Sequence, residues 1–518
     1  MSDERRKSMK PWTIMFCAFC TFALVACAPK VRTYEKVNSV SFSARANNAL
    51  GQAATRLGDP KDGRSGVKLI SDGEQALVSR LLLAAAAEQS IDAQYYLLHN
   101  DPTGHLFAAS LLQAADRGVR VRLLLDDMDT SGYDAMTAAL DYHENIEIRL
   151  FNPFWRNQSL IIAGLTDFKR INRRMHNKSM TADNVFTIVG GRNIGAEYFL
   201  AREEMNYADL DVLAAGPVVN EVSKSFDEYW NSEFAVPARV VVGQPEEFSL
   251  GQARSRLNEL VEAAKRTQYG EALRKSARES FADGTLSLDW VPAKLYADPP
   301  SKAAGLDNSG PILASQLLPY FESADREVNI VSAYFVPRNN GVKWMTELEN
   351  RGVEVKVVTN SLASNDVAPV YAHYAKKRRA LLRGGVELYE LRPDAYQVQR
   401  RGINWAQSRS GLHSKAFAVD DRYLFVGSFN WDPRSVNINT EMGILIDSPA
   451  LTAQTMGALD DALPAYTYHV TLESAGQLKW RTRGEDGEIL EYDSEPTGSA
   501  WDHIVAGFFS ILPIGSQL

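Results

Sequence analysis

Two mostly apolar stretches, 90–96 and 327–334, have the length of buried β-strands and lie in corresponding places along the chain. Each is followed by a helical pattern that ends at a glycine, Gly118 or Gly352, and then by a second apolar strand. A strand, a helix and another strand in this order form a βαβ unit, whose sheet is covered by helices. The pattern therefore predicts an α/β fold with two domains, each a mixed β-sheet flanked by helices.

The same polar residues recur after both units at the same spacing. Measured from a histidine, each half has Lys at +2, Asp at +7, Gly at +14, Asn at +17 and Glu at +28. The two sets are His176, Lys178, Asp183, Gly190, Asn193 and Glu204, and His413, Lys415, Asp420, Gly427, Asn430 and Glu441. A second copy by chance has odds on the order of one in 10^5. The chain is therefore read as a duplication, with the two domains fused and related by a pseudo-twofold axis.

Composition changes along the chain suggest where the domains end. At 518 residues the chain is too long for one ordinary core. Residues before the first strand are polar and rich in small side chains, and the charged middle segment is helix-prone. The expected segments are a signal peptide (1–26), a tether (27–65), a first domain (66–243), an inter-domain helical bridge (244–293) and a second domain (294–518).

The N-terminal segment has the pattern of a targeting signal. A basic stretch precedes an apolar run, 11–26, that is shorter than the ~20 residues a membrane-spanning helix needs. The sequence at 24–27, Leu-Val-Ala-Cys, resembles the lipobox of bacterial lipoproteins, whose cysteine is acylated. This resemblance implies lipidation of Cys27 and a place in the bacterial cell envelope, anchored to a membrane and facing the periplasm. The alternative is an uncleaved signal anchor.

Charge and cysteine content narrow the possible ligands. The formal net charge of -8 gives an unfavourable overall field for nucleic acid, so an anionic ligand needs a local basic patch. One candidate patch, Lys169, Arg170, Arg173 and Arg174, precedes the first motif, although a solvated loop is an equal alternative. The three cysteines all lie within the first 27 residues, which excludes a Cys-based zinc site in the folded domains.

The repeated motif suits phosphodiester chemistry. Residues two apart on a strand point to the same face, so each His-Lys pair can enter one pocket. Imidazole can act as nucleophile or as acid, while lysine and asparagine can donate hydrogen bonds to phosphate oxygens. Two motifs facing each other would put an attacking and a protonating histidine on opposite sides of phosphorus, as in-line displacement requires.

The motif His-x-Lys-x4-Asp-x6-Gly-[Gly/Ser]-x-Asn, present twice, resembles the signature of the phospholipase D superfamily. The resemblance implies that His176 and His413 are the catalytic pair, with His176 favoured as the nucleophile that forms a phosphohistidine. Phosphate binding is expected from Lys178, Lys415, Asn193, Ser428 and Asn430; the first motif has Gly191 where the second has Ser428. Glu204 and Glu441 are candidate orienters of the histidines. Asp183 and Asp420 belong to the catalytic motif, where a structural or pKa-setting role is favoured over direct catalysis.

A closer resemblance is to bacterial cardiolipin synthases, over 91–96, 172–178, 190–195 and 359–367. It implies phospholipid substrates, with phosphatidylglycerol as acceptor and phosphatidylglycerol or phosphatidylethanolamine as donor, and a monomer that holds both motifs. Hydrolysis of phospholipid headgroups, nuclease activity and non-catalytic lipid binding are the alternatives, in that order. No cofactor or metal is expected, because none of the six other histidines has a partner at the spacing of metal ligands. These histidines are His99, His105, His143, His373, His469 and His503.

Overall fold

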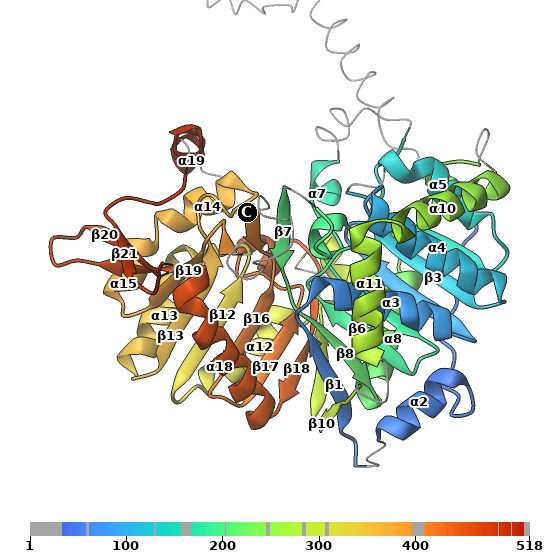
Figure 1. Cartoon of the computed structure of the whole chain (residues 1–518), viewed down its shortest axis with the longest axis horizontal. Coiled ribbons are helices and arrows are strands. Elements are labelled where there is room, and N and C mark those ends of the chain that lie inside the picture. The colour runs from blue at the N-terminus through green and yellow to red at the C-terminus, as the bar shows by residue number, and fades with distance from the viewer. Residues whose placement is uncertain are drawn as a thin grey trace, which may run out of the picture. The chain divides into compact units, whose positions relative to one another are not determined.

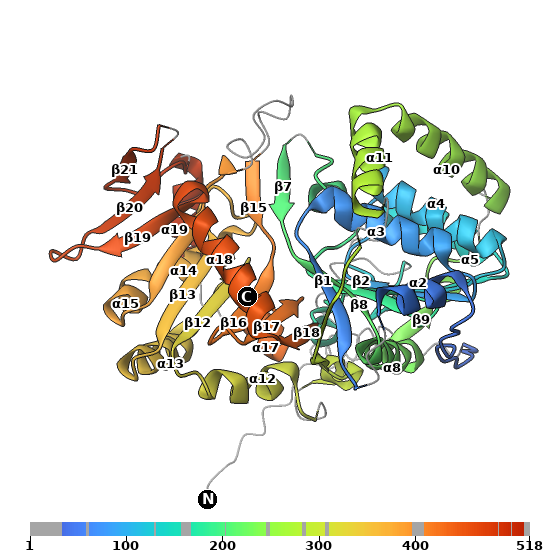
Figure 2. The same ribbon diagram turned by 60° about the horizontal axis from the view of Figure 1, so that its bottom comes forward.

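The computed structural model contains two large β-sheets, one from each half of the chain (Figures 1 and 2). Both sheets belong to a single unit, residues 38–518. The residues that the structure describes are 34–58, 62–128, 131–156, 167–202, 204–244, 249–281, 286–305, 310–395, 409–484, 486–498 and 500–511. Cys27 and the rest of the expected signal peptide lie outside these residues.

The first sheet has nine strands in the order β10-β1-β8-β6-β5-β2-β3-β4-β9. The neighbours β2-β3 and β3-β4 are parallel, and the other pairs are antiparallel. The strands are β1 (Ser65–Ile70), β2 (Ser90–Tyr95), β3 (Arg120–Asp126), β4 (Ile146–Phe151), β5 (Ser179–Ala182), β6 (Phe186–Gly190), β8 (Asp211–Ala215), β9 (Ala235–Pro237) and β10 (Asp289–Val291).

The second sheet has ten strands in the order β11-β18-β17-β16-β12-β13-β14-β19-β20-β21. Its core order, β18-β17-β16-β12-β13-β14, repeats the order β8-β6-β5-β2-β3-β4 of the first sheet, with the same parallel and antiparallel pairs. The duplicated mixed α/β fold is therefore confirmed. The strands are β11 (Ala293–Ala297), β12 (Glu327–Ser332), β13 (Glu354–Asn360), β14 (Glu387–Leu391), β16 (Lys415–Val419), β17 (Tyr423–Gly427), β18 (Met442–Asp447), β19 (Thr467–Leu472), β20 (Leu478–Arg483) and β21 (Ile489–Tyr492).

Helices flank both sheets, and several begin where the sequence supplies a cap. Asp72 and Asp101 accept hydrogen bonds from the first-turn N–H groups of α3 and α4, while Pro217 and Pro449 begin α8 and α18. In the first half the helices are α2 (Ala49–Leu57), α3 (Gly73–Ala86), α4 (Pro102–Asp116), η1 (Ser131–Tyr133), α5 (Asp134–Asp141), α7 (Phe168–Ile171), η2 (Ala196–Tyr198), α8 (Pro217–Asn231), α9 (Ala238–Val241), α10 (Leu250–Lys265) and α11 (Gln268–Phe281). In the second they are η4 (Pro300–Ala304), α12 (Leu313–Glu322), α13 (Arg338–Asn350), α14 (Ala368–Ala375), α15 (Arg378–Arg383), α17 (Pro433–Asn437), α18 (Pro449–Tyr466) and α19 (Ala500–Ile511). No helix among the described residues is long and apolar enough to cross a membrane.

Two of the expected connecting segments belong to the first half. In the segment expected as a tether, the backbone N–H groups of Ser39 and Ser41 donate to side chains of α8, and Asn48 donates to Asp183. The segment is attached to the first half at these points, while most of its residues from 35 to 47 are exposed. In the expected bridge, α10 and α11 pack against α4 and α3 (Figure 1).

The two halves meet through apolar and backbone contacts. One buried cluster contains side chains from both sheets, among them Val189 and Val212 from the first and Val426 and Ile444 from the second. Beside it, β7 (Met205–Ala208) and β15 (Arg409–Leu412) form a parallel two-stranded sheet between the halves (Figure 2). These contacts fix the first motif relative to the second.

Candidate active site

His176 is held by the second half of the chain. Its backbone N–H donates to the carbonyl of Thr440, and its Nδ1 lies 2.8 Å from Oε2 of Glu441. Both side chains are buried, and the ring of Tyr96 packs edge-on against the imidazole at 5.0 Å. A carboxylate at Nδ1 selects the tautomer with a proton there, which leaves the Nε2 lone pair available.

His413 is held by the first half in the corresponding way. Its backbone N–H donates to the carbonyl of Ala208, the last residue of β7, and its Nδ1 lies 2.6 Å from Oδ2 of Asp209. The rings of Tyr198 and Tyr207 lie 4.9 and 5.3 Å from the imidazole. Each half therefore supplies the carboxylate that orients the histidine of the other, so neither half has a complete site alone.

The two motif lysines lie beside the histidines at the start of equivalent strands. Nζ of Lys178 donates to the carbonyl of His176 at 2.7 Å, and Nζ of Lys415 lies 2.9 Å from Nδ1 of His413. Both lysines are buried. Lysines so placed can neutralise a phosphodiester that enters between the motifs.

The electrostatics of the site favour neutral imidazoles. Burial, reinforced by the charges of Lys178 and Lys415, lowers the pKa of both His176 and His413 well below the usual value. Each lysine acts on the histidine of the other half as well as on its own, which shows that the four groups lie within one electrostatic environment. Burial also lowers the pKa of Lys415 to about 8 and raises that of Glu441 to about 7.

The two motif asparagines stand in equivalent positions. Oδ1 of Asn193 accepts a hydrogen bond from the N–H of Leu97, and Oδ1 of Asn430 accepts one from the N–H of Tyr334. These contacts fix both amide groups by their oxygen atoms. The amide nitrogen of Asn193 donates to Tyr198, whose ring packs against His413. The structure thus brings together the histidines and lysines of both motifs, and Asn193 lies beside the tyrosine that packs against His413.

The structure does not bring Glu204 to a histidine, and the expectation for this residue is corrected to Asp209. Glu204 is exposed, and only its backbone carbonyl has a described contact, with the N–H of Arg409. The pairing of β6 with β8 and of β17 with β18 makes Asp209 the counterpart of Glu441. The first half has five more residues between the motif asparagine and this carboxylate, so counting a fixed offset of 28 from the histidine ended at Glu204. Alignment on the apolar strands would have found Asp209.

Ser428 supports a carboxylate instead of facing phosphate. Its hydroxyl is fully buried, donates to Glu441 and accepts from the N–H of Met442 at 3.0 Å. At the equivalent place in the first half, a Cβ on Gly191 would lie 2.1 Å from Oδ1 of Asp209. The glycine is therefore required by the close approach of the carboxylate.

The motif aspartates act away from the histidines. Asp183 accepts hydrogen bonds from the N–H groups of Glu88, Gln89 and Ser90, and Asp420 accepts the equivalent bonds from 325–327. Both have a positive φ, 52° and 54°, at the turn between two strands. They fix the start of β2 and β12, which agrees with the structural alternative considered for them.

Most of the basic patch before the first motif is structural. Arg174 is buried and forms an ion pair with Asp126 at 3.2 Å, and Arg170 pairs with Asp167 at 2.6 Å. Arg173 donates to the carbonyls of Lys302 and Asn437 in the second half. These arginines connect loops and halves.

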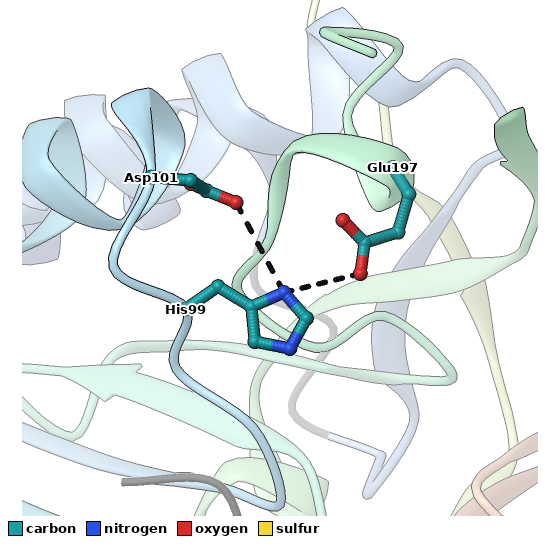
Figure 3. A group of neighbouring side chains, drawn as sticks. All are labelled: His99, Asp101 and Glu197. Atoms are coloured by element: carbon teal, nitrogen blue, oxygen red, sulfur yellow. Dashed lines mark ion pairs between the residues drawn. The ribbon is translucent and has the colours of Figure 1, made fainter. Parts of the chain in front are cut away.

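His99 is not the isolated histidine that the sequence suggested. Its Nδ1 lies 3.1 Å from Oε1 of Glu197 and 4.0 Å from Oδ2 of Asp101, and the three ligand-type atoms lie within 4.8 Å of one another (Figure 3). Asp101 also caps α4 and accepts the N–H of Ala196 at 2.7 Å. The cluster of His99, Asp101 and Glu197 therefore connects α4 to η2.

Comparison with known proteins places the geometry in context. A family model described as cardiolipin synthase, PLD-like domain, matches residues 81–230 and 317–461. The chain is 40% identical to cardiolipin synthase C of Escherichia coli K12 over 90% of this chain and 98% of that protein. It is 26% identical to cardiolipin synthase B of Salmonella typhi, over 73% and 76% of the two chains. The crystal structure of a phosphatidylserine synthase from Haemophilus influenzae shares the fold, with a TM-score of 0.52 and 13% identity over 82% of this chain and 92% of that one.

Proposed function

Because the chain belongs to the phospholipase D superfamily and, within it, to the cardiolipin synthase-like phosphatidyltransferases, we propose that it makes cardiolipin from phosphatidylglycerol. The phosphatidyl donor is phosphatidylglycerol or phosphatidylethanolamine, and the intermediate is a phosphohistidine. The observation that carries the proposal is the pairing of each motif histidine with a carboxylate of the other half. In the neutral form this pairing puts the proton of each imidazole on Nδ1, and both imidazoles lie in one buried site.

In the first step Nε2 of His176 attacks phosphorus of the donor lipid, and the P–O bond to the headgroup alcohol breaks. His413 gives its proton to the leaving alkoxide, so glycerol or ethanolamine departs. Burial favours the neutral imidazole that the nucleophile needs. For His413, the negative charge of the bound phosphodiester opposes that effect and favours the protonated form.

In the second step a terminal hydroxyl of phosphatidylglycerol attacks the phosphohistidine. His413, now neutral, takes the proton of that hydroxyl, and the bond between phosphorus and His176 breaks as cardiolipin forms. Lys178, Lys415 and the two motif asparagines donate to the non-bridging oxygens in both steps. Water competes with the lipid alcohol for the same intermediate, so exclusion of water decides between transfer and hydrolysis.

We also propose that acylation of Cys27 holds the enzyme at a membrane of the cell envelope, facing the periplasm. The supporting observation is the Leu-Val-Ala-Cys sequence after an apolar run. Labelled fatty acid should be incorporated into the wild-type protein and not into Cys27→Ser. Equal labelling of the two proteins would remove the lipoprotein assignment.

The experiment that tests the enzymatic proposal is mass spectrometry of lipids after the purified protein is incubated with phosphatidylglycerol, with and without phosphatidylethanolamine. Cardiolipin should accumulate together with free glycerol or ethanolamine, and the His176→Asn protein should produce neither. Phosphatidic acid as the sole product would identify a hydrolase instead. No lipid product under either condition would contradict the proposal.

A further inference from the structure

A large cavity lies in the second half, apart from the two histidines. It has a volume of about 950 Å³, at the upper end of the roughly 300–1,000 Å³ typical of ligand sites. It opens between α12, α13, the end of α14 and the segment around α17. Its apolar lining includes Leu317, Phe321, Val336, Trp344, Phe429 and Trp431.

The aromatic rings of this cavity form one continuous wall. Trp344 and Trp431 stack with centroids 5.2 Å apart, and Phe321 meets both of them edge-on at 5.5 Å. Contact with these rings buries the surface of an apolar ligand away from water, and the ring faces form no hydrogen bonds with the ligand. The chemistry of the wall therefore fits a hydrocarbon chain.

The same cavity carries positive charge. Arg338, Lys376 and Lys377 line it, and Lys377 donates to Asn339. In the described part of the chain, Arg338 and Lys376 are exposed and have neither an ion-pair nor a hydrogen-bond partner. Asp432 is the acidic residue among the described lining residues, and its carboxylate is engaged in capping α17. A ligand of this cavity should thus be apolar at one end and anionic at the other.

Arg338 is held in an unusual backbone conformation. Its φ of 51° lies in the left-handed region, which a non-glycine residue adopts at a conformational cost. The residue starts α13, directly after Pro337, and both line the cavity.

An exposed apolar stripe adjoins the cavity. Ser510 of α19 lines it, and on the same helix Ile504 and Phe508, one turn apart, are 61% and 57% exposed. Phe509 packs instead against the core of the second half. Because α19 lies next to α14 (Figure 1), whose end lines the cavity, lipid could cover the stripe and fill the cavity together.

We propose that this cavity is an accessory binding site for an anionic phospholipid. An acyl chain lies against Trp344 and Trp431, and the phosphate lies between Arg338 and Lys376. The site is separate from the catalytic one, but its occupant contacts Phe429 and Trp431, the neighbours of Asn430 in the chain. Binding here requires no phosphoryl transfer, so the inference goes beyond the proposed function.

The test is photo-crosslinking in phosphatidylcholine nanodiscs that contain phosphatidylglycerol with a diazirine on its acyl chain. The expected labels fall on peptides that contain Trp344 and Trp431. The variant Arg338→Asn/Lys376→Gln should reduce this labelling about tenfold, because cations near an anionic lipid each strengthen its binding. Asparagine is chosen at 338 because it tolerates the left-handed conformation.

The matched control is Lys343→Gln on the same helix. Its exposed side chain pairs with Glu347, and it is not among the described residues that line the cavity. It should label like the wild type, and unfolding midpoints should show that all variants fold. Equal labelling of the double variant and the control would overturn the inference, as would equal labelling by a phosphatidylcholine probe or labels confined to the catalytic peptides. Labelling retained by a protein that makes no cardiolipin would count against the proposed function alone.

Discussion

The two halves of the molecule repeat one strand order, yet they support their histidines differently. Glu441 reaches His176 with a long side chain, and the buried hydroxyls of Ser428 and Ser435 both donate to its carboxylate. Asp209 reaches His413 with a shorter one. The backbone contacts differ too, since a four-residue strand pair leads to His413 and a single bridge leads to His176.

The shorter carboxylate leaves no room for a hydroxyl. Gly191 approaches Asp209 so closely that a Cβ would meet the carboxylate, whereas Ser428 in the same position donates to Glu441. Nζ of Lys415 contacts the ring of its histidine, while Nζ of Lys178 contacts the backbone carbonyl of its histidine and the ring of Tyr96. A duplicated backbone thus carries two unequal sites, and displacement at phosphorus gives the two histidines unequal roles, because one attacks and the other transfers protons.

The largest effect is expected from removal of either histidine. His176→Asn and His413→Asn should each lower the rate of cardiolipin formation about 10^3-fold or more, and the double variant should be scarcely slower, because the two groups act as a unit. Initial rates by lipid mass spectrometry give the comparison. Full activity in either single variant would contradict a mechanism that uses both.

Removal of the orienting carboxylates comes next. Glu441→Gln and Asp209→Asn should each cost about 10^2-fold in kcat, since the histidine loses the partner that fixes its tautomer. Glu204→Gln is the matched control, because its side chain is exposed, and it should retain wild-type kcat. If Glu204→Gln lowered kcat and Asp209→Asn did not, Glu204 would again be the residue that orients His413.

The Gly191–Ser428 difference gives a smaller effect. Gly191→Ala should lower kcat about tenfold, or ~1.4 kcal/mol of barrier, because Asp209 must move away from the new methyl group. Ser428→Ala should instead lower the free energy of unfolding by about 1–3 kcal/mol, since Met442 loses a buried acceptor. Measurements of kcat and of denaturant unfolding on both variants separate these outcomes. Equal changes of kcat and of unfolding free energy in the two variants would mean that the two halves are equivalent at this position.

The smallest effect concerns pH. The pKa of Lys415, lowered to about 8 by burial, means that its charge is present below that pH and is lost as the pH rises through it. The KM for phosphatidylglycerol should therefore rise above about pH 8. Lys415→Arg should remove this alkaline rise, because a guanidinium stays charged. An unchanged pH profile of KM in the arginine variant would show that Lys415 does not bind the phosphate.

The sequence predicted the fold well because duplication and apolar strands are local signals. The strands around 90–96 and 327–334 and the histidines of both motifs required only periodicity and spacing. Asp209 was missed because the first half has five more residues between the motif asparagine and this carboxylate. The same stretch contains β7, which pairs with β15, far away in the sequence. The pattern of hydrophobic residues and the spacing of the motifs do not reveal contacts between the two halves, such as the pairing of β7 with β15.

The partners of Ser428 and the attachment points of the segment before β1 were missed for a related reason. A buried hydroxyl next to a catalytic motif can bind substrate or support a neighbour, and only its three-dimensional partners decide between the two. Similarly, Ser41 and Asn48 look like linker residues until their partners on α8 and at Asp183 are known. Composition describes a segment's polarity, but it cannot say whether that polarity is solvated or hydrogen-bonded.

The most direct test of the two-histidine account is to trap the covalent intermediate. A p-nitrophenyl phosphodiester has a leaving group that needs no proton, so it can phosphorylate the enzyme without the acid. The His413→Asn protein should accumulate an acid-labile, base-stable adduct that mass spectrometry places on His176, and His176→Asn should accumulate none. The reverse pattern would exchange the roles of the two histidines. An adduct on serine, or turnover by both variants without an adduct, would contradict the phosphohistidine mechanism itself.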